Sequence, residues 1–75
     1  MRVYFATHGV HGYVDFAAGW PGLGVLACLA QAMSDVTRAC PICPNVAACA
    51  FLAALAESAP LEVAADLYEL AAEWS

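Results

Sequence analysis

Residues 2–16 decide the fold of this 75-residue chain, and their sequence is RVYFATHGVHGYVDF. Residues that favour strands, β-branched and aromatic, fill Arg2–His8 and recur in His11–Phe16. Gly9 and Gly12 flank the point at which the chain must reverse, and glycine supplies the positive φ that a tight turn needs. The stretch therefore predicts an N-terminal β-hairpin.

Side-chain alternation along the two expected strands predicts one face for the core and one for solvent. The core face would carry Val3, Phe5, Val14 and Phe16, and the outer face Tyr4, Tyr13 and Asp15. An isolated hairpin is marginally stable in water. We therefore expect this hairpin to pack on the rest of the chain or to pair with another copy.

Helical periodicity follows a turn at Gly19–Gly22 and predicts three helices, at about Leu23–Ala39, Asn45–Ser58 and Pro60–Trp74. Proline ends the first helix because it lacks an N–H, and Asn45 is the expected N-cap of the second. The prediction is a single domain over residues 1–75, in the α+β class, with a β-hairpin followed by three α-helices.

The three predicted helices differ in their apolar patterns. The first has one stripe for the core, formed by Leu26, Leu29, Met33 and Val36. The second is apolar nearly all round, which is typical of a central, buried helix. The third has a core edge at Val63, Leu67, Leu70 and Trp74 beside an acidic edge.

Composition excludes several classes of protein. Hydrophobic residues make up 64% of the chain and charged residues only 12%, which excludes intrinsic disorder. Two arginines face seven carboxylates, for a net charge of −5, so direct nucleic-acid binding is not expected. No catalytic constellation or phosphate-binding glycine loop is present, so we do not expect an enzyme. The apolar run Gly22–Met33 is shorter than the roughly 20 residues of a membrane span, which predicts a soluble, intracellular protein without membrane contact.

The cysteines form the one local motif. Residues 40–49 read CPICPNVAAC, which places Cys40, Cys43 and Cys49 close together, with Cys28 upstream. The four thiolates could hold zinc or an iron–sulfur cluster, some pair could form a disulfide, or all could be buried free thiols. His8 and His11 could add imidazole ligands or simply be solvated in the hairpin loop.

The pattern C-x2-C-P-x4-C at residues 40–49 resembles the cluster motif of the WhiB-like family of actinobacterial and phage iron–sulfur regulators. This resemblance implies a 4Fe–4S cluster on Cys28, Cys40, Cys43 and Cys49, and a transcription regulator that binds a sigma factor. The basic DNA-binding tail of that family is missing here, and an acidic helix stands in its place.

Carboxylates gather at the end of the chain. Glu62, Asp66, Glu69 and Glu73 are spaced four, three and four residues apart, so they project from one helix within roughly 60°. No lysine or arginine lies on the same helix. This edge is either a solvated face that keeps an apolar protein soluble or a binding edge for a basic partner. Tyr4, Tyr13 and Asp15 form a second candidate patch.

In its small size, acidic charge and lack of catalytic residues, the chain resembles the phage-encoded anti-CRISPR inhibitors. The resemblance implies a stoichiometric inhibitor, without a cofactor, in the cytoplasm of a bacterial host. It would bind a basic groove of a nucleic-acid-handling complex, such as a CRISPR effector, through Asp15, Glu62, Asp66, Glu69 and Glu73. Two alternatives stay open: the iron–sulfur or zinc-bound regulator, and a structural module that dimerises through the hairpin edge. A homodimer is expected because the chain is so apolar.

Overall fold

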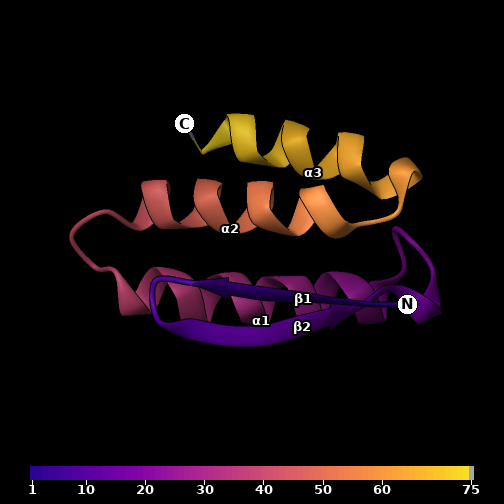
Figure 1. Cartoon of the computed structure of the whole chain (residues 1–75), viewed down its shortest axis with the longest axis horizontal. Coiled ribbons are helices and arrows are strands. Elements are labelled where there is room, and N and C mark those ends of the chain that lie inside the picture. Colours follow the sequence, from indigo (N-terminus) through magenta and orange to yellow (C-terminus); the bar gives the residue numbers. More distant parts are fainter. Residues whose placement is uncertain (75) are drawn as a thin grey trace.

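The computed structural model describes residues 1–74, the side chain of Ala18 excepted, and confirms the α+β class (Figure 1). In chain order its elements are β1 (Arg2–Thr7), β2 (Val10–Asp15), the short 3₁₀ helix η1 (Phe16–Ala18), α1 (Leu23–Ala39), α2 (Pro44–Ser58) and α3 (Leu61–Glu73). No helix within residues 1–74 is long and apolar enough to cross a bilayer.

The hairpin has the predicted faces, but its two-residue turn lies one residue earlier than predicted. The strands pair antiparallel, with Val3 opposite Val14 and Tyr4 opposite Tyr13. Only two residues connect them, His8 (φ 52°) and Gly9 (φ 78°), so the second positive-φ residue is His8 and not Gly12. Gly12 instead lies within β2 opposite Phe5, and the Phe5 ring lies over it.

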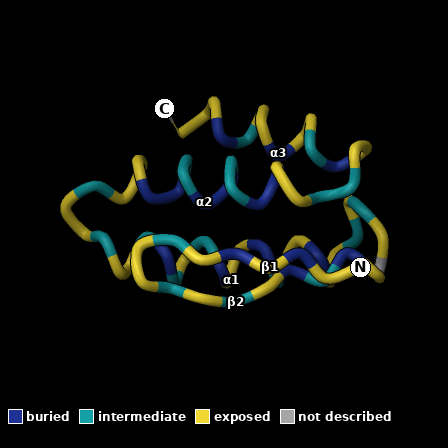
Figure 2. The backbone as a smooth tube through the Cα atoms, viewed as in Figure 1, coloured by how far each residue is buried: buried dark blue, intermediate teal, exposed yellow. Residues whose placement is uncertain are grey.

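Helix α2 lies at the centre of the molecule. Figure 1 shows α1, α2 and α3 lying horizontally and running in alternate directions, with α2 between the other two and the hairpin over α1. Strand β1 packs on α2 and β2 packs on α1, while α3 packs on α2. The buried residues converge on this middle helix in Figure 2, as the apolar pattern predicts. Its fully buried members include Phe51, Leu52 and Leu55.

The core stripe of α1 is rotated from the predicted one. Val25, Leu29, Ala32 and Val36 are buried, whereas Leu26 is exposed and Met33 only half-buried. The reason is that α1 packs against two neighbours, β2 and α2, and their joint position sets the rotation of the helix. Leu26 instead lines an open groove with Trp20, Pro21 and residues of α3.

The start of α2 also differs from the prediction. The helix begins at Pro44, and Cys43, not Asn45, occupies the N-cap position, without a side-chain hydrogen bond. Proline is well suited to the first helical position, because its missing N–H would have no partner there. The predicted end of α1 at Ala39 is confirmed.

Two glycines make a matched pair for testing the packing of the hairpin. A Cβ on Gly12 would lie 3.0 Å from Cζ of Phe5, whereas a Cβ on Gly24, in the first turn of α1, meets nothing within 4 Å. We expect Gly12→Ala to destabilise the fold by about 1 kcal/mol, because the Phe5 ring must move within a packed core. Gly24→Ala should stabilise it by about 0.5–1 kcal/mol through helix propensity. Urea unfolding measures the change in the free energy of unfolding of each variant. Equal changes in the two variants would contradict the Phe5–Gly12 contact.

Candidate partner-binding surface

The carboxylates of α3 all face outward. Glu62, Asp66, Glu69 and Glu73 are exposed, while Val63, Leu67 and Ala71 bury the opposite edge against α2. The predicted core edge is therefore correct at its first two positions. Leu70 is half-buried and Trp74 is 37% exposed, because the row spaced by four residues, 63–67–71, forms the contact ridge.

One of these carboxylates is fixed by a distant residue. The indole Nε1 of Trp20 donates a hydrogen bond to Oδ2 of Asp66 at 2.8 Å, across 46 residues of sequence. The Trp20 ring packs near Phe16, with ring centroids 5.9 Å apart, so the turn after η1 holds the donor in place. The N-terminal half of the chain thus orients a carboxylate of the last helix.

An open groove lies between this turn and α3. Trp20, Pro21 and Leu26 line one side, and Asp66, Glu69, Leu70 and Glu73 the other, around a volume of about 310 Å³. Three carboxylates therefore border an aromatic and aliphatic wall. We call this surface the acidic groove. Glu62 lies on the same helix edge beyond it.

The acidic groove is not neutralised within the described chain. Neither arginine is bonded to it: Arg2 lies 3.9 Å from Asp15 and over the Tyr13 ring, and Arg38 donates to Oγ of Ser34 at 3.3 Å. Within residues 1–74, no ion pair involves a carboxylate of α3. Repulsion between these carboxylates is relieved only by solvent and salt, which leaves a local negative field.

Asp15 lies apart from the acidic groove and is bonded locally. It accepts a hydrogen bond from the backbone N–H of Ala17 at 2.9 Å and lies 3.6 Å from the N-terminal ammonium of Met1. The Ala17 hydrogen bond is the main cause that lowers the pKa of the Asp15 carboxyl, and the ammonium and Arg2 act in the same direction. The Asp15 carboxylate therefore stabilises the junction between the hairpin and η1.

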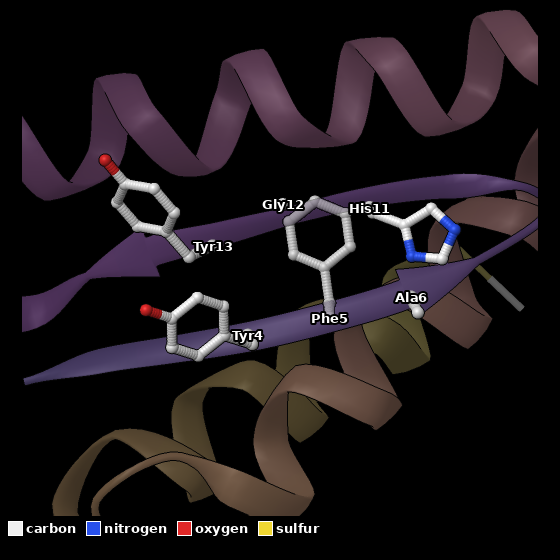
Figure 3. Close-up of a pocket in the computed structure, with 6 residues that line it drawn as sticks. All are labelled: Tyr4, Phe5, Ala6, His11, Gly12 and Tyr13. Atoms are coloured by element: carbon white, nitrogen blue, oxygen red, sulfur yellow. The ribbon is translucent and has the colours of Figure 1, made fainter.

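Tyr4 and Tyr13 are brought together on the outer face of the hairpin, as predicted. Their ring centroids are 5.8 Å apart, and Figure 3 shows them side by side, with Phe5 over Gly12 and His11 further along the ladder. With the Arg2 guanidinium 4.5 Å from the Tyr13 ring centroid, the patch is aromatic and cationic. It is thus a different kind of surface from the acidic groove.

The cysteines occupy three separate places. Cys40 and Cys43 are paired as a disulfide in the loop between α1 and α2. The Cys28 thiol lies 3.7 Å from the carbonyl oxygen of Tyr13, and Cys49 lines a groove on α2. Within residues 1–74, no three His, Cys, Asp or Glu side chains are grouped to hold a metal ion. His8 and His11 are exposed, and His8 Nδ1 lies 2.9 Å from Oγ1 of Thr7.

The geometry of the acidic groove suits recognition of a cation. A carboxylate trio beside an indole can take an arginine or lysine side chain through ion pairing and cation–π contact. Sequence spacing alone finds the carboxylates, but no sequence signal links Trp20, Pro21 and Leu26 to them. No family model, curated protein or solved structure matches this chain.

Proposed function

We propose that this protein is a non-enzymatic binding protein that contacts a basic protein surface through the acidic groove and the adjoining carboxylate of Glu62. The observation that carries the proposal is the Trp20–Asp66 hydrogen bond, which orients one carboxylate among others that have no cationic partner in residues 1–74. A merely solvated face needs no such fixed geometry.

The charge spacing on α3 supports a particular class of partner. The carboxylates of Glu62, Asp66, Glu69 and Glu73 extend over about 16 Å of helix, from a rise of 1.5 Å per residue. Their mean separation is about 5.5 Å along the axis, so the helix presents a regular row of negative charges, as the phosphates of one nucleic-acid strand do. The partner we propose is therefore a basic groove that ordinarily holds nucleic acid, such as that of a CRISPR effector, and the protein would inhibit it by occupancy.

Charge reversal on the acidic groove tests this proposal. The probe is a fluorescent deca-arginine peptide, titrated with the wild-type protein and with Glu69→Lys/Glu73→Lys at low and high NaCl. We expect the variant to bind at least ten-fold more weakly at low salt and to show a flatter salt dependence, because attraction falls with the product of the charges. Its stability should change by less than about 1 kcal/mol, since both side chains are exposed.

The control is Asp35→Lys/Glu57→Lys, which changes the net charge equally but lies on α1 and α2. Less than a three-fold loss is expected for this control. If both double variants lose affinity equally, the peptide senses only net charge and the acidic groove is not a site. If the groove variant binds as tightly as the wild type, the proposal fails.

A further inference from the structure

A second groove is apolar, unlike the acidic groove. It runs along the outer side of α2 and is lined by Asn45, Val46, Cys49, Ala50, Ala53 and Trp74, with a volume of about 440 Å³. We call it the α2 groove. Among the described residues, no Asp, Glu, Lys or Arg lines it, and Asn45 is the only polar amide in its lining. Its walls, Val46 and Trp74, are 62% and 37% exposed.

This side of α2 is the one that the described chain leaves uncovered. Helix α1, strand β1 and helix α3 pack on the other sides of α2. The positions on this side are the exposed Val46 and the half-buried Cys49, Ala50 and Ala53, spaced i, i+3, i+4 and i+7, which is the spacing of a helix-packing stripe. A packing stripe that faces solvent on the most central helix of a small domain indicates a missing partner element.

Charge indicates what that partner is. With a net charge of −5, a second copy of this chain is repelled by the acidic groove but meets no carboxylate among the described residues that line the α2 groove. A basic partner gains nothing from an uncharged groove, whereas a second copy buries its own apolar stripe at the same time. Electrostatic repulsion between copies is therefore weaker at the α2 groove than at α3, and the apolar contact must outweigh it.

The shape of the α2 groove meets the requirement of a two-fold interface, in which a projecting part and a hollow lie on the same face. Val46 projects near one end, and the small side chain of Ala53 leaves space about 10 Å further along the helix. An axis near Cys49 and Ala50 therefore places Val46 of each copy over Ala53 of the other. The small residues between them permit the close approach of antiparallel helices.

We infer that the protein forms a homodimer in which the α2 helices of two copies pack antiparallel across the α2 groove. Helix α2 is about 22 Å long, so the contact belongs to the small, weak class of interfaces, which bury less than about 1,200 Å² in total. A dissociation constant in the micromolar range is expected. This interface is distinct from the hairpin-edge dimer that the sequence suggests, and it leaves the acidic groove of each copy free.

Sedimentation equilibrium between 10 and 500 μM measures the self-association. We expect the dimer to become stronger as NaCl is raised, because salt screens repulsion between like-charged copies and the contact itself is apolar. Partner binding at the acidic groove has the opposite salt dependence, so the two proposals fail independently. A monomer mass throughout this range at high salt would overturn the dimer.

Two variants locate the interface. Ala53→Glu and Val46→Glu each place a carboxylate in the α2 groove, and each should weaken dimerisation at least ten-fold. Ala30→Glu, at an exposed position of α1, should leave it unchanged. Circular dichroism checks that each variant folds. Because Val46 is largely exposed, Val46→Glu should fold and keeps the test valid even if Ala53→Glu does not fold. A dimer of wild-type strength in folded Val46→Glu would overturn the inference.

Thiol cross-linking tests the predicted axis. In Cys28→Ser, with the Cys40–Cys43 disulfide intact, a short bismaleimide should link Cys49 of two copies in high yield. In Cys49→Ser the remaining thiol of Cys28 lies beside β2, and little cross-linked product is expected. Equal yields from both variants would place the contact elsewhere and overturn the α2 interface.

Discussion

Replacing Phe51 with alanine is expected to abolish most of the stability of the fold. Phe51 is fully buried on α2, and its ring meets Phe5 of β1 edge to face, with centroids 4.7 Å apart. A buried Phe→Ala change costs about 3–5 kcal/mol, through lost burial and the cavity that remains. A domain of this length has only about 4–11 kcal/mol of stability in total. The melting temperature should therefore fall by at least about 12 °C.

Thermal and urea unfolding by circular dichroism measure this loss. Leu61→Ala is the matched control, because Leu61 is 90% exposed at the start of α3 and should shift stability by less than about 0.5 kcal/mol. Phe51→Leu should lie between the two. A melting temperature for Phe51→Ala within 5 °C of the wild type would mean that the Phe5–Phe51 contact is not what joins the hairpin to the helices.

Leu67→Ala is expected to release α3 in preference to the other elements. Leu67 is fully buried, and α2 supplies the main packing surface for α3. The substitution should cost about 2–5 kcal/mol. Because β1, β2 and α1 do not depend on that contact, the loss should be concentrated in α3, as local opening rather than uniform destabilisation.

Hydrogen exchange followed by mass spectrometry separates these outcomes. Peptides from α3 should exchange at least a hundred-fold faster in Leu67→Ala, whereas peptides from β1 and α2 should change less. Binding of the deca-arginine peptide should weaken as well, because an undocked α3 loses the Trp20–Asp66 hydrogen bond. Tyr68→Ala, at the half-exposed neighbouring position, should neither speed exchange in α3 nor weaken peptide binding. Uniform acceleration along the whole chain would show that α3 and the hairpin unfold as one unit.

The sequence predicts the elements better than it predicts their rotation. Strand alternation places Val3, Phe5 and Val14 correctly, because a two-residue repeat has only two possible faces. A helix offers many faces, and the apolar residues of α1 form two overlapping stripes. The predicted core stripe contains Leu26, whereas packing against β2 and α2 buries Val25. The packing partners, and not the periodicity, therefore decide the rotation of α1.

The candidate site, likewise, is predicted only in part. Glu62, Asp66, Glu69 and Glu73 follow from local spacing within one helix. The contribution of Trp20 does not, because 46 residues separate it from Asp66 and only the packing of α1 and α3 on α2 brings them together. The cysteine prediction left several alternatives open, since spacing alone does not determine which thiols meet. In the structure Cys40 pairs with Cys43, three residues away.

The placement of the two tryptophans makes the protein its own optical reporter. Trp20 and Trp74 are the only tryptophans of the chain, and they line the acidic groove and the α2 groove respectively. Indole emission shifts to the blue when water is excluded from the ring and changes in intensity when a charge approaches it. With Trp74→Phe or Trp20→Phe, emission from the remaining indole therefore follows events at one surface alone. A cationic ligand and a second protein copy can thus be distinguished without a label, by which of the two single-tryptophan variants responds.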